Sequence, residues 1–160
     1  INTMPISINV SRVNFYSTGL CEYLMELLDK YHLDSSCLKL EVTESAYTEN
    51  SQQMLCAMDT LQKNGFKIMM DDFGSGYSNF IRIIRLKPDY LKIDGSLIKN
   101  IDKDNNSYEI VKSIITFSKT LNIKTIAEYV HSEEIFNLLL ELDVDEFQGY
   151  YFGKPDEDFS

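Results

Sequence analysis

The sequence predicts an α/β domain in which parallel strands alternate with helices. Short apolar stretches with strand character recur along the chain, and segments with helical spacing of apolar residues separate them. Parallel strands need crossover helices, so this alternation predicts a parallel sheet. The run Ile68-Met69-Met70 is continuously apolar, as expected for a strand covered on both faces. Polar residues gather where the strands end, as they do around the mouth of an enzyme barrel.

Length and charge limit what the chain can be. Its 160 residues and 44% hydrophobic content are enough for a core, so we treat residues 1–160 as a single domain. A net charge of −10 argues against DNA or RNA polymers as partners, because phosphate backbones need clustered Lys and Arg. The three cysteines lack C-x-x-C spacing, which favours a reducing cytoplasm over a disulfide framework. No membrane-spanning run or signal peptide is visible, although a longer parent protein could be membrane-anchored.

The first half of the chain contains two predicted strands and two predicted helices. Residues 5–11 alternate in polarity as a strand does, and residues 38–45 form a second strand that ends in acidic residues. Residues 18–31 carry leucines at helical spacing. Asn50 with Gln53 resembles an N-cap pair, and the helix that follows should stop at Asn64-Gly65.

The buried strand at residues 67–72 ends in two adjacent carboxylates. A glycine turn then begins at Gly74, because glycine adopts backbone conformations that other residues resist. Residues 78–86 are predicted to form a short helix, which Pro88 terminates. Residues 89–95 form the fourth strand.

The last third of the chain repeats the alternation. Residues 101–107 are charged and polar, and we expect an exposed loop there. A helix over residues 108–121 has a broad apolar face, and residues 124–130 form the fifth strand. Ser132 can cap the next helix, and residues 146–152 are the sixth predicted strand.

Polar side chains mark the carboxyl ends of the predicted strands, which share one face in a parallel fold. They are Asn9, Glu41, Asp71, Asp72, Lys92, Asp94, Glu128 and Gln148. The carboxylate and amide oxygens of this set suit Mg²⁺ or Mn²⁺. Two such metals, bridged by a carboxylate, would activate a water and stabilise the leaving oxygen of a phosphodiester. The structural alternative is a set of solvated acidic turns without metal.

Lys92 is the one cation among these predicted strand ends. It could pair with the transferring phosphate or orient the attacking water. Its alternative is an ion pair with Asp94 or Glu41.

The residues at the strand ends resemble the successive motifs of EAL domains. The segments that carry the resemblance are Asn9-Val10-Ser11, Glu41-Val42-Thr43-Glu44-Ser45, Asp71-Asp72-Phe73-Gly74-Ser75-Gly76-Tyr77-Ser78, Leu91-Lys92-Ile93-Asp94, Ala127-Glu128 and Gln148-Gly149-Tyr150. They occur in the family's order over nearly the whole chain. The resemblance implies a TIM-type (β/α) barrel and hydrolysis of cyclic di-GMP to linear pGpG with two Mg²⁺ or Mn²⁺ ions, in bacterial signalling.

The resemblance also implies a role for each matching residue. Asn9, Glu41 and Asp71 would hold the first metal, and Asp71 would bridge to a second that Asp72 helps to bind. Lys92 would lie beside the hydrolytic water, Glu128 and Gln148 would belong to the polar shell, and Gln148 and Pro155 would contact the substrate. Gly74 and Ser75 would belong to a loop that orders the metal site and a dimer interface, and Glu44 would anchor this loop.

Three departures from the family pattern stand out. The chain has no Glu-Ala-Leu motif, which supplies a further metal ligand in the family. About six strand-helix units are present, so the barrel is incomplete and resembles the C-terminal two-thirds of the domain. Tyr129 and His131 replace a small residue and an acid of the family's Ala-Glu-Gly-Val-Glu segment.

These departures leave two functional readings open. In the first, the intact parent is a phosphodiesterase with upstream domains, and this chain alone is weak or inactive. In the second, the chain is a degenerate module that binds cyclic di-GMP or a protein partner without turnover. Either way, the open edges of an incomplete barrel are expected to be covered, by a homodimer or another form of self-association, by rearrangement, or by a missing N-terminal segment.

Overall fold

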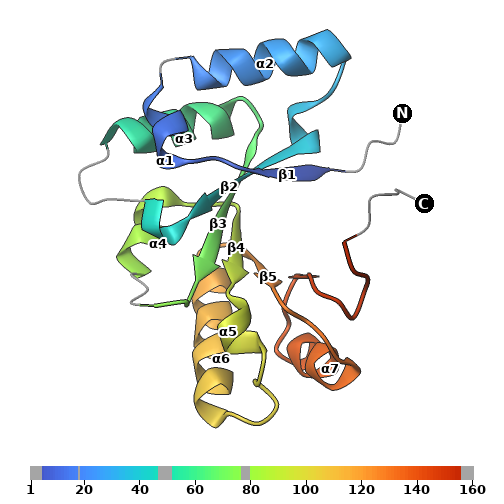
Figure 1. The fold of residues 1–160 in the computed structure, drawn as a ribbon. Coiled ribbons are helices and arrows are strands. Elements are labelled where there is room, and N and C mark those ends of the chain that lie inside the picture. Colours follow the sequence, from blue (N-terminus) through green and yellow to red (C-terminus); the bar gives the residue numbers. More distant parts are fainter. Residues whose placement is uncertain (1–4, 18, 47–51, 77–79, 156–160) are drawn as a thin grey trace. The chain divides into compact units, whose positions relative to one another are not determined.

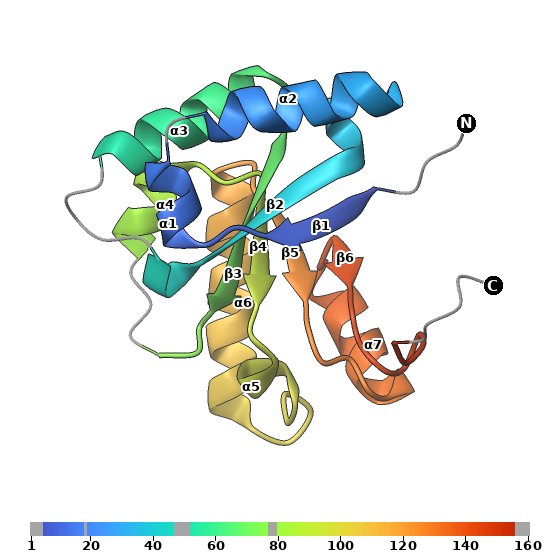
Figure 2. The same ribbon diagram turned by 45° about the horizontal axis from the view of Figure 1, so that its top comes forward.

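The computed structural model describes residues 5–17, 19–46, 52–76 and 80–155, in which strands and helices alternate (Figures 1 and 2). The strands are β1 (Ile6–Asn9), β2 (Leu38–Thr43), β3 (Lys67–Phe73), β4 (Tyr90–Ile93), β5 (Lys124–Ala127) and β6 (Glu146–Phe147). The α-helices are α1 (Arg12–Tyr16), α2 (Leu20–Tyr31), α3 (Gln52–Lys63), α4 (Phe80–Leu86), α5 (Gly95–Ile98), α6 (Asn105–Thr120) and α7 (Glu133–Glu141), and the short 3₁₀ helices are η1 (Ser35–Cys37) and η2 (Glu44–Ala46).

The strands are hydrogen-bonded in the order in which they occur in the chain, from β1 to β6. The pairs β1–β2, β2–β3 and β5–β6 are parallel. Sequential parallel strands joined by helices are the topology of a (β/α) barrel, which closes with eight strands. The described part of the chain therefore has the predicted fold, an incomplete TIM-type barrel with six strands.

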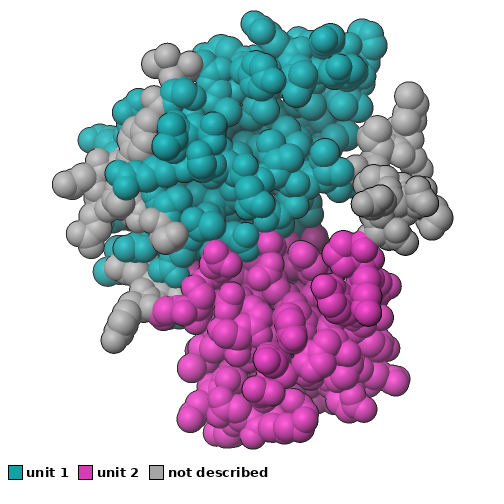
Figure 3. Space-filling model, in the orientation of Figure 1, with its two compact units in different colours: residues 1–71, 79–90 teal, residues 72–78, 91–160 magenta. Residues whose placement is uncertain are grey.

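The chain divides into two compact units (Figure 3). Unit 1 comprises Ile1–Asp71 and Asn79–Tyr90, and unit 2 comprises Asp72–Ser78 and Leu91–Ser160. β3 and β4 both start in unit 1 and end in unit 2.

In unit 1, α2 and α3 lie side by side, and α1 packs against α3 (Figures 1 and 2). The core of this unit is made of fully buried side chains from β2, α3, β3 and α4 and from the residue just before β3. They include Leu40, Met54, Met58, Leu61, Phe66, Ile68 and Ile83. Lys67 and Asp89 hold the start of β3, because the Asp89 carboxylate accepts hydrogen bonds from Lys67 Nζ at 2.8 Å and from the Ile68 amide at 3.0 Å.

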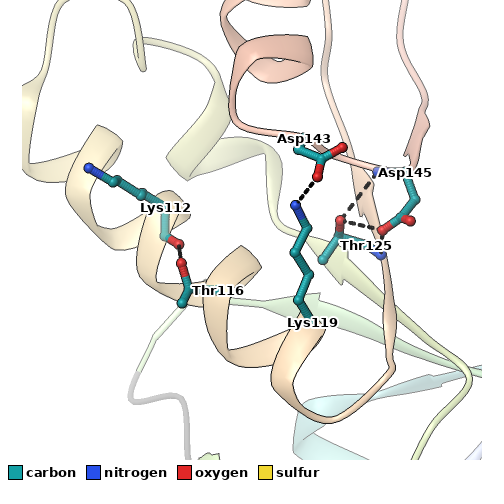
Figure 4. A network of polar contacts seen from close by, with 6 residues as sticks. All are labelled: Lys112, Thr116, Lys119, Thr125, Asp143 and Asp145. Carbon is teal, nitrogen blue, oxygen red and sulfur yellow. Dashed lines mark hydrogen bonds and ion pairs between the residues drawn. The ribbon is translucent and has the colours of Figure 1, made fainter.

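In unit 2, α6 packs against β5 and α5. The buried side chains of this unit include Phe73, Leu91, Ile93, Ile98, Val111, Ile114, Ile135 and Leu139. A polar network ties β5 to the segment that leads into β6 (Figure 4). Asp145 accepts hydrogen bonds from the amide of buried Thr125 at 2.8 Å and from its hydroxyl at 3.0 Å, and Lys119 of α6 pairs with Asp143.

Several boundaries differ from those predicted. The expected loop over residues 101–107 is shorter, because Asp104 caps α6 and starts it at Asn105. The sixth strand was predicted over residues 146–152, but β6 ends at Phe147 and residues 150–152 form turns. The short helices α1 and α5 were not predicted. The proposed cap Asn50 lies outside the described residues.

Among the residues that the structure describes, no helix has both the length and the apolar character needed to cross a membrane.

Candidate functional site

The parallel register of unit 1 aligns three of the predicted ligands. Asn9, the last residue of β1, is directly opposite Glu41 of β2, and the Val10 amide donates a 2.8 Å hydrogen bond to the Glu41 carbonyl. Glu41 is opposite Met69 of β3, and Thr43 is opposite Asp71. Because side chains alternate between the two faces of a strand, Asn9, Glu41 and Asp71 share one face of this sheet. Glu41 is buried, with 8% exposure, and Asp71 is half-buried.

Glu44, the predicted anchor of the loop after β3, lies in η2 and is buried. Its Oε1 is 3.6 Å from Arg82 Nη1 of α4, and the same nitrogen donates a 3.2 Å hydrogen bond to the Glu44 carbonyl. Arg82 was not predicted to belong to the site. Nothing in the sequence marks it, because its partner is distant along the chain.

The end of β3 carries the two consecutive aspartates, with Asp71 as the last residue of unit 1 and Asp72 as the first residue of unit 2. Asp72 has a φ of 58°, in the left-handed region that Asp tolerates better than most residues. Gly74 follows with a φ of 98°, as the predicted glycine turn requires. A Cβ at Gly74 would be 2.4 Å from Leu97 Cδ1, so this position has no room for a side chain unless Leu97 moves. Ser75 donates its amide to the Asp72 carbonyl at 3.3 Å.

Three predicted site residues come together within unit 2. Carboxylate oxygens of Asp72 and Glu128 lie within 4.8 Å of each other. Lys92 Nζ is 2.7 Å from Glu128 Oε1, and the two side chains are 6% and 20% exposed. Lys92 thus forms an ion pair with Glu128, an acid that the sequence had not suggested as its partner. Asp94, one of the two acids considered for that role, caps α5 by accepting a 2.9 Å hydrogen bond from the Ser96 amide.

A cavity of about 650 Å³ in unit 2 adjoins this group. The residues that line it are Asp94, Gly95, Glu128, Tyr129, His131, Gln148, Gly149 and Tyr150. It contains the predicted residues Glu128 and Gln148, whereas Pro155 is exposed and is not one of the residues that line it. The volume is in the range of small-molecule binding pockets.

Gly149 lies where two backbone segments cross. The Val130 amide donates to the Gln148 carbonyl at 3.0 Å, and the Tyr151 amide donates to the Val130 carbonyl at 3.0 Å. A Cβ at Gly149 would be 2.1 Å from the Val130 carbonyl oxygen. The glycine after Gln148 is therefore needed for this close approach, which fixes the position of Gln148 at the cavity.

Tyr129 and His131 form one wall of the cavity. Tyr129 has a φ of 59°, unusual for an aromatic residue, and is 51% exposed. The His131 ring meets the Tyr129 ring edge-on with 5.3 Å between centroids, and His131 Nδ1 is 3.1 Å from the Tyr129 carbonyl oxygen. His131 does not belong to the group of carboxylates described above.

Three residues of the cavity were given no role by sequence reasoning. They are Gly95, Gly149 and Tyr150. A Cβ at Gly95 would be 2.8 Å from the Tyr129 Cβ, and the Tyr150 side chain is 65% exposed. Each lies within two positions of Asp94 or Gln148, so closeness to these residues in the sequence was the available signal.

Comparison with known proteins assigns these motifs to one family. The family model described as EAL domain matches residues 1–155. The chain is 38% identical over 148 residues to cyclic di-GMP phosphodiesterase PdeF of Escherichia coli, covering 89% of this chain and 20% of that protein. It is 38% identical over 150 residues to cyclic di-GMP phosphodiesterase PdeA of Borreliella burgdorferi, covering 94% of this chain and 22% of that protein. The chain therefore spans about a fifth of the length of these relatives.

Solved structures show the same fold. The structure of the PaMucR phosphodiesterase in complex with c-di-GMP matches with a TM-score of 0.86 and 34% identity, covering 94% of this chain and 61% of that one. Klebsiella pneumoniae BlrP1, in a manganese/cy-diGMP complex, matches with a TM-score of 0.90 and 28% identity, covering 96% of this chain and 40% of that one.

Proposed function

The chain belongs to the EAL domain family, and we propose that it is part of a metal-dependent phosphodiesterase domain that hydrolyses cyclic di-GMP to linear pGpG in bacterial signalling. The relatives named as cyclic di-GMP phosphodiesterases support this substrate. The observation that carries the proposal is the group at the ends of β3, β4 and β5 in unit 2. There, the Asp72 and Glu128 carboxylates lie within 4.8 Å of each other, and Lys92 is paired with Glu128.

The donors fit a hard divalent cation. Carboxylate and amide oxygens are the ligands that Mg²⁺ and Mn²⁺ prefer, and the register of unit 1 places Asn9, Glu41 and Asp71 on one face. These three residues would hold the first metal, and Asp71 with Asp72 would hold the second. When bound, the two ions would supply an activated water and charge stabilisation at the leaving oxygen. The similar structures of BlrP1 in calcium/cy-diGMP and manganese/cy-diGMP complexes support a divalent ion.

The protein's own groups would position the substrate and a proton donor. Lys92 Nζ lies 2.7 Å from Glu128 Oε1 and can donate hydrogen bonds that orient the attacking water or the scissile phosphate. The ion pair with Glu128 would fix the direction of the Lys92 side chain. Gln148, at the cavity, would donate or accept a hydrogen bond with the substrate, and Pro155 would contact it. Glu44 would hold the loop that carries Gly74 and Ser75, because its carboxylate can accept hydrogen bonds from the backbone amides of that loop.

We also propose the setting in which the domain works. Upstream domains of a longer cytoplasmic or membrane-anchored parent would control it, since the matched relatives are several times longer than this chain. β1 stands at one end of the strand order with all four of its residues exposed, including Ile6 at 58%. Such an edge favours a homodimer or other self-association. The chain by itself would be weak or inactive, because it lacks the Glu-Ala-Leu segment.

A second candidate is a module that binds cyclic di-GMP without turnover. The observation that favours it is Tyr129, a half-exposed aromatic residue at the cavity beside Glu128. Restoring glycine at 129 and glutamate at 131 in the full-length parent distinguishes the two. If the parent is inactive and stays inactive after restoration, the module reading is favoured.

The test of the phosphodiesterase proposal is product formation. The chain and its longer parent are incubated with cyclic di-GMP and Mn²⁺, and linear pGpG is measured by chromatography. We expect product from the parent that disappears with chelator and with Asp71→Asn, and little product from the chain alone. The matched control is Asp143→Asn, which changes an exposed aspartate and should leave turnover unchanged. Product that survives both chelator and Asp71→Asn would overturn the metal assignment.

A further inference from the structure

Tyr129 occupies a backbone conformation that resists its side chain. Its φ of 59° is in the left-handed region, which is unfavourable for an L-residue without a short polar side chain and far less so for glycine. A side chain held there persists only when its surroundings fix it, and such outliers gather at functional sites. Gly95 and His131 supply these surroundings for Tyr129.

Gly95 leaves room for the Tyr129 side chain, because a Cβ at Gly95 would be 2.8 Å from the Tyr129 Cβ and 3.4 Å from its Cγ. His131 holds the ring from another side, with its own ring edge-on at 5.3 Å and its Nδ1 3.1 Å from the Tyr129 carbonyl oxygen. Despite these contacts the Tyr129 side chain is half exposed, and it lines the 650 Å³ cavity. The ring is thus both oriented and accessible.

We infer that Tyr129, oriented by His131, is a specificity-determining residue on which one purine base of the cyclic dinucleotide stacks. The inference rests on the proposed function and names an element of its substrate recognition. The same cavity presents a second exposed aromatic ring, Tyr150, and the carboxylate and amide groups of Glu128 and Gln148. Aromatic faces next to convergent polar groups are how proteins hold extruded bases, because every base offers a π-face. The larger purine rings stack over more area than pyrimidine rings do.

The opposite possibility is that Tyr129 obstructs the cavity. Binding experiments separate the two, because removal of a stacking ring weakens binding whereas removal of an obstruction strengthens it. We would measure binding of cyclic di-GMP and of cyclic di-UMP, both in Ca²⁺, to the parent protein by calorimetry. The variants are Tyr129→Asn, which tolerates the left-handed conformation without a ring, and Tyr129→Phe, which keeps the ring.

Stacking predicts that Tyr129→Asn binds cyclic di-GMP on the order of tenfold more weakly and that Tyr129→Phe stays within about twofold of the wild type. The preference for cyclic di-GMP over cyclic di-UMP should fall in Tyr129→Asn, a change that a loss of folding would not produce. Tyr23→Asn is the matched control, since Tyr23 is 62% exposed on α2 and does not line the cavity. It should bind as the wild type does.

Two results would overturn the inference while leaving the proposed function intact. One is wild-type affinity in Tyr129→Asn, and the other is tighter binding in that variant. A wild-type parent that binds no cyclic di-GMP would instead overturn the proposed function and, with it, this inference.

Discussion

Lys92 and Glu128 form an ion pair with 2.7 Å between Nζ and Oε1, and it joins β4 to the segment directly after β5. The Lys92 side chain is 6% exposed and the Glu128 side chain 20%, so both charges are largely removed from water. In such a pair the loss of one partner leaves the other charge buried and uncompensated. The stability of unit 2 and the orientation of Lys92 are therefore linked.

The first prediction concerns this pair. Lys92→Met should lower the free energy of unfolding by about 1–3 kcal/mol, because it leaves the Glu128 carboxylate without its cation. The double variant Lys92→Met/Glu128→Gln should lose less than the sum of the single variants, with a coupling of about 1–2 kcal/mol. Urea unfolding followed by circular dichroism measures the cycle. The exposed pair Lys63–Asp59 is the control, and its coupling should not exceed about 0.5 kcal/mol.

The second prediction concerns Gly95 and Tyr129. Gly95→Ala should destabilise the wild type by about 1–3 kcal/mol, since the new methyl group would overlap the Tyr129 Cβ. In a Tyr129→Gly background the overlap is gone, and alanine at this first residue of α5 should stabilise the protein by roughly 0.4–1 kcal/mol, because it restricts the unfolded chain more than glycine does. Thermal unfolding of the four proteins tests the change of sign. An equal effect of Gly95→Ala in both backgrounds would contradict the contact.

The third prediction concerns the backbone crossing at Gly149. Gly149→Ala should destabilise the protein by about 3 kcal/mol or more, because its Cβ would overlap the Val130 backbone, which cannot rotate away. Gly153→Ala is the matched control, because a Cβ there meets nothing within 4 Å, and we expect a change within about 0.5 kcal/mol. Chemical denaturation measures both. Equal stability of the two variants would refute the crossing.

The fourth prediction concerns the cap of α6. A hydrogen bond from the Ser107 hydroxyl and one from the Asn106 amide lower the pKa of Asp104 below its ordinary value. The cap therefore stabilises the fold at pH values above the ordinary pKa, and this contribution is lost as the pH falls through the lowered pKa of the folded state.

The protection of the Asn106 and Ser107 amides from hydrogen exchange, relative to the intrinsic exchange rate at the same pH, should accordingly fall in acid in the wild type. In Asp104→Ala this protection should already be low at neutral pH. Ser107→Ala removes the largest cause of the shift, so an NMR titration should show the pKa of Asp104 moving back toward its ordinary value. A pKa of Asp104 that is unchanged by Ser107→Ala would contradict this account.

The sequence alone predicted the order of strands and helices well, because hydrophobic periodicity reports burial directly. It also located Asp72, Lys92 and Glu128, which the structure brings together within unit 2. It failed where a tertiary contact decides the outcome. The sixth strand ends at Phe147 rather than continuing to Phe152, because the Val130 amide donates a hydrogen bond to the Gln148 carbonyl and the chain turns at Gly149.

The pairing of Lys92 with Glu128 was not predicted, for a similar reason. Asp94 is its near neighbour in the sequence, but the Asp94 side chain is engaged by the Ser96 amide at the start of α5. Since α5 was not predicted, its cap could not be either. Tyr129 was identified as a departure from the family. Its left-handed backbone and its closeness to Gly95 do not follow from the sequence, because they depend on the folded chain.

β1 has all four of its residues exposed, and it carries Asn9 at its end. A strand held mainly by backbone hydrogen bonds to one neighbour should open more readily than the buried β2 and β3, so its amides should exchange with solvent first in unit 1. If Asn9 binds a metal ion, occupancy and strand docking become one equilibrium. Added metal would then slow exchange along β1 as the free metal concentration rises above the dissociation constant. The exchange rate of this strand would therefore report how much free metal is present.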